Sequence, residues 1–200
     1  KLKNPPFGGF FNSGQKAHSA IITKITGNPM RLLIFSLCLL ISFSTSAAVN
    51  NGDAAPSMLG KNGKGDDVTV AQFKGKVIVI SFWATWCGYC LKELPALSHI
   101  QNSVGTDFIQ VVAVNYKEDM REANGIMRKM KDKQLLSLYD RKGSVGDSYG
   151  VKGLPNLWII DPDGKVAAHH IGYGEASLST IAKDILRILQ KHNPELMEKT

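Results

Sequence analysis

The chain has 200 residues, of which 44% are hydrophobic, and a formal net charge of +7. This length limits it to one domain of ordinary size with room for further segments. Residues 1–48 carry five basic residues and no acidic one, so the rest of the chain has 19 basic against 17 acidic residues. A remainder this close to neutral argues against a nucleic-acid partner.

The front of the chain has the features of an export signal. Met30 and Arg31 precede an apolar run of about ten residues, which is typical of a signal peptide and short for a membrane span. The small residues Ser46 and Ala48 favour cleavage after Ala48. Residues 30–48 are therefore predicted to be a signal peptide, and the mature protein to be periplasmic or otherwise extracytoplasmic. An uncleaved membrane anchor is the alternative.

The front of the chain also contains a cysteine, Cys38, and a polar segment at 1–29. Cys38 suggests a lipoprotein, but the bulky Leu37 occupies the preceding position, which needs a small residue, and this disfavours lipidation. Residues 1–29 are polar, contain glycine and show no clear period. We interpret them as a non-native or mispredicted extension, with an unusually long leader as the alternative.

The mature chain begins with a predicted β-hairpin at 57–70, around a turn signal at Asn62-Gly63. Residues 77–82 form a short β-branched apolar run, which indicates a buried strand. Apolar residues then recur at helical spacing, which predicts a helix over 88–103 with one apolar face. Pro95 lies inside that helix and should kink it.

The later elements alternate between strands and helices. Strands are predicted at 108–115, 135–139, 157–160 and 166–171, and helices at 119–131, 143–149 and 178–192. The residues Asp-Pro-Asp-Gly at 161–164 are a strong turn signal between the last two strands. This order predicts an α/β fold, with a central mixed β-sheet covered by helices on both faces.

Export would leave two cysteines, Cys87 and Cys90, where the strand at 77–82 gives way to the helix. The free N–H groups of a first helical turn and the helix dipole both favour a thiolate there. A lone close pair in an oxidising compartment is predicted to be functional rather than structural. A zinc half-site is disfavoured, because no second pair lies at ligand spacing and His169 and His170 point to opposite faces of a strand. We therefore expect no metal and no other cofactor.

The stretch Phe-Trp-Ala-Thr-Trp-Cys-Gly-Tyr-Cys at 82–90 resembles the active site of thioredoxin-fold proteins. The flanking motifs are similar to those of TlpA/ResA-type extracytoplasmic thiol–disulfide oxidoreductases, and they lie at 55–56, 73–77, 111–115, 149–155 and 159–165. The resemblance spans about residues 53–190. It implies a thioredoxin-like fold for domain 49–200, with an N-terminal β-hairpin extension, and thiol–disulfide exchange as its chemistry.

The helix-start argument predicts that Cys87 is the attacking thiol and that Cys90, one turn deeper, is the resolving thiol. The resemblance implies that Pro155 is a cis-proline beside the disulfide. The predicted substrate groove comprises Trp86, Gly88, Tyr89, Leu154 and Pro155. Trp83 is expected in the core, whereas Trp86 either forms a semi-exposed docking surface or simply packs. The Gly-Tyr pair between the sulfurs also occurs in DsbC-type isomerases, which leaves the direction of electron flow open.

Four charged or polar residues lie near the cysteine pair or in the motifs around it. Cytoplasmic thioredoxins have a buried Asp two residues before the first Trp, where this chain has Ser81. The resemblance instead implies that Glu118, in the motif Val-Asn-x-x-Glu, accepts the proton of Cys90. A solvated glutamate at the start of the next helix is the alternative. Residues 92–93, Lys-Glu, are predicted to lie on a solvated helix face.

The predicted function is that of an exported protein-disulfide reductase. The resemblance implies a membrane thiol carrier of the DsbD/CcdA kind as electron donor, and apocytochrome c or other exported protein thiols as substrates, hence a role in cytochrome c biogenesis. An oxidant or isomerase of the same fold is the first alternative. A thiol peroxidase is disfavoured because Ala84 stands where those enzymes have Thr. A copper-delivery protein resembling the Sco family is disfavoured because Cys-x-x-Cys is one residue short of that family's spacing.

Overall fold

The computed structural model describes residues 49–130 and 134–194. The predicted signal peptide at 30–48 and the segment 1–29 lie outside these residues. Within the described part of the chain, no helix is both long enough and apolar enough to cross a membrane.

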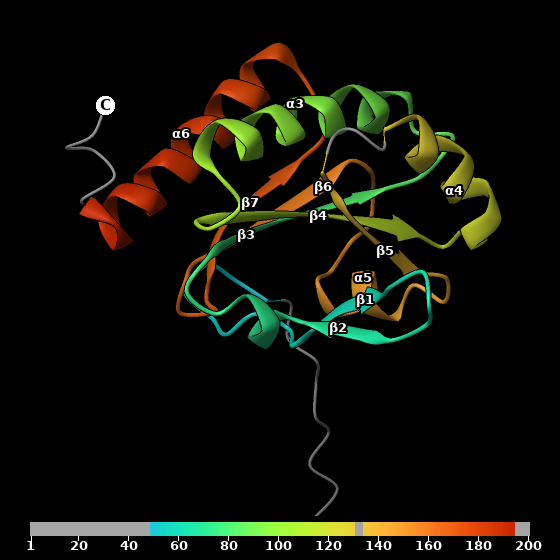
Figure 1. Cartoon of the computed structure of the whole chain (residues 1–200), viewed down its shortest axis with the longest axis horizontal. Coiled ribbons are helices and arrows are strands. Elements are labelled where there is room, and N and C mark those ends of the chain that lie inside the picture. The colour runs from blue at the N-terminus through green and yellow to red at the C-terminus, as the bar shows by residue number, and fades with distance from the viewer. Residues whose placement is uncertain (1–48, 131–133, 195–200) are drawn as a thin grey trace, which may run out of the picture. The chain divides into compact units, whose positions relative to one another are not determined.

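A mixed sheet of seven strands, in the order β2-β1-β5-β4-β3-β6-β7, forms the centre of the described fold (Figure 1). The strands are β1 (Met58–Lys61), β2 (Asp67–Thr69), β3 (Val77–Trp83), β4 (Ile109–Tyr116), β5 (Leu136–Asp140), β6 (Asn156–Ile160) and β7 (Val166–Ile171). The central β3 runs parallel to β4 and antiparallel to β6. The hairpin β1–β2 joins the edge of the sheet through an antiparallel contact with β5. The predicted mixed sheet and its N-terminal hairpin are thus confirmed.

In the part of the chain that the structure describes, four α-helices and one short 3-10 helix accompany the sheet. They are η1 (Val70–Phe73), α3 (Gly88–Val104), α4 (Met120–Lys129), α5 (Ser144–Ser148) and α6 (Glu175–His192). Helices α3 and α6 lie together on one face, with α4 beside them, and α5 lies on the other (Figure 1). The α-helices match those predicted from the sequence, whereas η1 was not predicted. Sheet and helices together confirm the predicted thioredoxin-like α/β fold.

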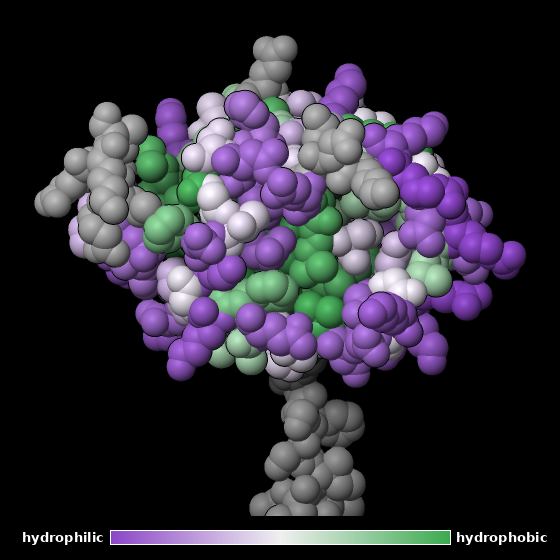
Figure 2. Space-filling model, viewed as in Figure 1, coloured by the Kyte–Doolittle hydropathy of each residue, from purple (hydrophilic) through white to green (hydrophobic). Residues whose placement is uncertain are grey.

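The central strand is buried along its whole length, because both of its faces are covered. Val77 and Val79 pack on the side of α3 and α6. Ile78 and Ile80 point the opposite way and pack with the residues of α5 and η1. Hydrophilic residues dominate the surface seen in Figure 2, and hydrophobic ones gather near its middle. The last residue of the strand, Trp83, therefore lies at the end of the sheet where α3 begins.

Candidate active site

Cys87 and Cys90 form a disulfide at the start of α3. After β3, the N–H of Cys87 donates to the carbonyl of Ala84 at 3.1 Å, which closes a turn. Cys87 is the N-cap of α3, and its Sγ accepts a hydrogen bond from the N–H of Cys90 at 3.2 Å. An N-cap atom satisfies an N–H that has no partner within the helix. A thiolate on Cys87 would receive the same N–H and the positive end of the helix dipole.

The two sulfurs differ in accessibility in the predicted order. Cys87 is 6% exposed, whereas Cys90 is fully buried. Both belong to an apolar cluster that includes Trp83, Leu94 and Ala113. A second sulfur that approaches from solvent therefore reaches Cys87 first.

Two large aromatic side chains beside the disulfide project into solvent. Trp86 is 73% exposed and Tyr89 is 60% exposed. The Tyr89 ring stacks on the ring of Tyr173 from the β7–α6 loop, with 5.9 Å between their centroids. Trp83, by contrast, is buried as predicted. The alternative in which Trp86 simply packs against the rest of the protein is wrong, because most of its side chain contacts solvent.

The peptide bond between Leu154 and Pro155 is cis, which confirms the predicted cis-proline. Pro155 is buried, and Leu154 packs against the apolar cluster that contains the disulfide. The next residue, Asn156, pairs with Phe82 on β3. This pairing places the cis-proline loop at the same end of the sheet as the cysteines. The fifth predicted groove residue, Gly88, has open space where a side chain would be.

Glu118 holds the loop that precedes Cys87. Its carboxylate accepts hydrogen bonds from Thr85 N at 2.8 Å, from Thr85 Oγ1 at 2.6 Å and from Asn115 Nδ2 at 2.6 Å. The side chain is half-buried, and α4 begins two residues later with Asp119 as its N-cap. The alternative of a solvated glutamate is therefore wrong. The assignment of Glu118 as proton acceptor of Cys90 stays a prediction, whereas its contacts with Thr85 fit a positioning residue.

Glu93, which was predicted to lie on a solvated helix face, is a buried carboxyl group. It is 1% exposed, and its Oε1 accepts a hydrogen bond from Ser81 Oγ at 2.8 Å. Burial raises the pKa of Glu93 from 4.5 to about 7, against the opposing effect of the Ser81 hydrogen bond. The prediction of a solvated helix face is thus wrong for Glu93, although Lys92 is exposed as expected.

Spacing within the helix would have revealed Glu93. It follows Cys90 by three residues and precedes Leu97 by four, so all three lie on one face of α3, and all three are buried. Residues three apart on a helix have Cβ atoms about 5–6 Å apart, which places the Glu93 carboxyl one turn below Cys90. The site therefore has a buried acid supplied by the helix, and Ser81 on the strand supplies its hydrogen-bond donor.

Comparison with known proteins gives consistent matches. A family model described as Redoxin matches residues 50–185. The thiol-disulfide oxidoreductase ResA of Bacillus cereus is 30% identical over 62% of this chain and 71% of its own length. The thiol:disulfide interchange protein DsbE of Escherichia coli K12 is 34% identical over 50% of this chain, but this spans only 51% of DsbE. A crystal structure of a DsbE-type protein from Chlorobium tepidum, described there as putative, is 31% identical with a TM-score of 0.66, over 71% of this chain and 99% of that one.

Proposed function

The chain belongs to the Redoxin family and is a thiol–disulfide oxidoreductase of the thioredoxin fold, and on that premise we propose that it is an exported reductase of protein disulfides. The observation that carries the proposal is the position of Cys87 as the N-cap of α3, next to the fully buried Cys90. This arrangement favours a thiolate on the outer sulfur and a protonated thiol on the inner one.

The proposed reaction starts from the reduced dithiol. The Cys87 thiolate attacks one sulfur of a substrate disulfide, forms a mixed disulfide and releases the other substrate sulfur as a thiolate. Cys90 then loses its proton and attacks the Cys87 sulfur, which releases the second substrate thiolate. Two electrons have passed to the substrate, and the protein is left with the Cys87–Cys90 disulfide.

We assign the proton of Cys90 to Glu93 rather than to Glu118. Glu93 lies one turn below Cys90 on the same helix, and burial holds its pKa at about 7. A group whose pKa lies near the working pH is well suited to take up and release a proton. Glu118 already accepts three hydrogen bonds, two of them at one carboxylate oxygen. We assign Glu118 the task of fixing Thr85, and with it the loop that carries Trp86 and Cys87.

The proposed docking surface consists of Trp86, Gly88, Tyr89, Leu154 and Pro155. Its support is the exposure of the two aromatic side chains and the absence of a side chain at Gly88, which lets a substrate backbone come close to Cys87. A disulfide-bearing polypeptide in extended form fits such a surface, because aromatic side chains supply apolar contact at little cost in side-chain entropy.

The predicted signal peptide and the resemblance to TlpA/ResA-type proteins support a proposal for the location and the partners of the protein. We propose cleavage after Ala48, which would release domain 49–200 outside the cytoplasm. Each turnover leaves a disulfide that must be reduced again by a two-electron donor. We propose a membrane thiol carrier of the DsbD/CcdA type for this step, and apocytochrome c or other exported thiol proteins as substrates.

A redox titration of Cys87 and Cys90 in glutathione and dithiothreitol buffers, read by alkylation of free thiols, tests the proposal. A reduction potential of about −270 mV or below supports a reductase. A potential of about −120 to −200 mV would instead indicate an oxidant or isomerase. The Cys87→Ser variant serves as the control, since it cannot close the disulfide.

A further inference from the structure

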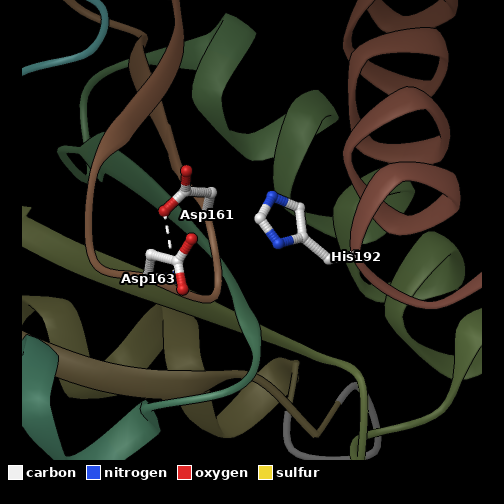
Figure 3. Close-up of side chains that lie close together, drawn as sticks. All are labelled: Asp161, Asp163 and His192. Atoms are coloured by element: carbon white, nitrogen blue, oxygen red, sulfur yellow. Dashed lines mark hydrogen bonds between the residues drawn. The ribbon is translucent and has the colours of Figure 1, made fainter.

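A second group of ligand-type side chains lies away from the disulfide, between the β6–β7 turn and the end of α6. Asp161, Asp163 and His192 each offer one ligand atom, and these atoms all lie within 4.8 Å of one another. The His192 imidazole faces the two carboxylates across the gap between turn and helix (Figure 3). Asp163 is exposed and the other two side chains are half-buried, so the group is open to solvent on one side.

We propose that Asp161, Asp163 and His192 form a binding site for a divalent transition-metal ion, with Zn²⁺ as the ion that fits best. Zn²⁺ is held by imidazole nitrogen and carboxylate oxygen at about 2.0–2.2 Å. Ca²⁺ and Mg²⁺ take oxygen ligands, so an imidazole in the group disfavours them. Three protein ligands leave a fourth tetrahedral position for water.

The turn prepares one of the ligands for binding. Asp161 Oδ1 accepts hydrogen bonds from the N–H of Asp163 at 3.0 Å and from the N–H of Lys165 at 2.9 Å. These two bonds fix the orientation of the Asp161 carboxylate. Ligand atoms around a tetrahedral Zn²⁺ lie about 3.4 Å apart, given bonds of about 2.1 Å. The three ligand atoms lie within 4.8 Å of one another, so the group has to close by about 1.4 Å at most, through small rotations of its side chains.

The helix also favours a cation at this place. His192 is the last residue of α6, where the unpaired carbonyl groups and the negative end of the helix dipole lie. The bound ion would join the C-terminal helix to the turn between β6 and β7. The same turn is hydrogen-bonded to the segment before β1, because Ala55 N donates to the carbonyl of Gly164 at 3.0 Å. The expected consequence of binding is a more stable domain.

The site is separate from the redox chemistry. Ile160, just before the turn, pairs with Ile78 near the start of β3, whereas the disulfide follows the end of β3. The seven residues of β3 span about 20 Å at 3.3 Å per residue. Metal binding should therefore leave the reduction potential of Cys87 and Cys90 unchanged.

Calorimetric titration of the untagged, oxidised protein with ZnCl₂ tests the proposal, and the closed disulfide removes the cysteines as competing ligands. We expect one ion per chain with a Kd in the micromolar range, and a melting temperature raised by several degrees at saturation. His192→Gln and Asp163→Asn should each weaken binding at least tenfold and remove the rise in melting temperature. His99→Gln, which changes an exposed histidine elsewhere on the surface, should leave both unchanged.

Four results would overturn the proposal, and the fourth concerns the cysteines. The first is a Kd above about 1 mM for the wild-type protein. The second is equal binding by wild type and His192→Gln, which would place the ion elsewhere. The third is binding of Ca²⁺ more tightly than Zn²⁺, which would contradict an imidazole ligand. A variant in which both cysteines are replaced by serine should bind Zn²⁺ as the wild type does, and loss of binding there would assign the ion to the cysteines.

Discussion

Burial of the Glu93 carboxyl group should lower the free energy of unfolding of the wild-type protein in a pH-dependent way. Replacing Glu93 by Gln should remove this effect. The side chain is 1% exposed, and burial raises its pKa from 4.5 to about 7. At pH values above both pKa values, the carboxylate is ionised in the folded and in the unfolded chain. The difference between the two pKa values then amounts to about 3 kcal/mol of lost folding free energy.

The sign of the effect follows from which state binds the proton. At pH values below 4.5 the folded and unfolded chains both hold it, and ionisation costs nothing. Between 4.5 and about 7 the unfolded chain loses the proton first, so the free energy of unfolding falls as the pH rises. Above that range the cost is constant. Glu93→Gln should therefore gain stability relative to wild type as the pH rises through this interval.

Urea unfolding of both oxidised proteins, at several pH values from about 4.5 to 8.5, measures the effect as a change in the difference between their free energies of unfolding. Burial of the Gln amide has its own cost, but that cost does not depend on pH. Other titrating groups cancel because both proteins have them, including His169, whose pKa burial lowers. Ser81→Ala should enlarge the pH-dependent cost, because it removes the hydrogen bond that lowers the pKa of Glu93. Parallel stability curves for wild type and Glu93→Gln would refute the reasoning, since they would mean that Glu93 titrates normally in the folded protein.

Three further predictions concern exchange and processing. Cys90→Ser should let mixed disulfides with substrate accumulate through Cys87, and non-reducing gels with thiol alkylation will show this; trapping mainly in the Cys87→Ser variant would reverse the assignment. Glu118→Gln should slow exchange with no change in the pH at which the thiols ionise, whereas a changed thiol titration would make Glu118 the proton acceptor after all. The intact mass of the exported protein should correspond to an N-terminus at Val49, and a membrane-bound form that retains residues 30–48 would support the anchor.

Periodicity predicted the fold well where the chain buries a continuous or regularly spaced set of apolar side chains. The run at 77–80 is buried on both faces of the sheet, so its apolar character shows directly in the sequence. The helix α4 begins at Met120, one residue after the predicted start, because Asp119 is its N-cap and accepts from the N–H of Arg121. The 3-10 helix η1 escaped prediction because its four residues are too few to show a period.

The two proposed sites were predicted less completely than the fold, because each includes residues that lie far apart in the sequence. Glu118 and Thr85 are 33 residues apart, and only the adjacency of β3 and β4 brings them together. Asp161 and His192 are likewise joined only by the packing of the last helix beside the β6–β7 turn. Neither contact leaves a pattern in the local sequence, whereas Cys-x-x-Cys does, because both of its members lie on one helical turn.

Glu93 shows a different reason for failure, since its position on the buried face of α3 was present in the spacing all along. Glutamate is almost never fully buried unless it is paired. The residue type therefore favoured an exposed side chain, whereas the position on the helix favoured a buried one. Position prevails here because Ser81, which points from β3 toward α3, offers a donor at 2.8 Å. Thioredoxins that carry an Asp on the strand hold their buried acid at the place of Ser81. In this chain a Glu from the helix takes that space, and a second carboxyl at Ser81 would face it at hydrogen-bonding distance and repel it. The serine is thus the residue that allows the helix to supply the acid.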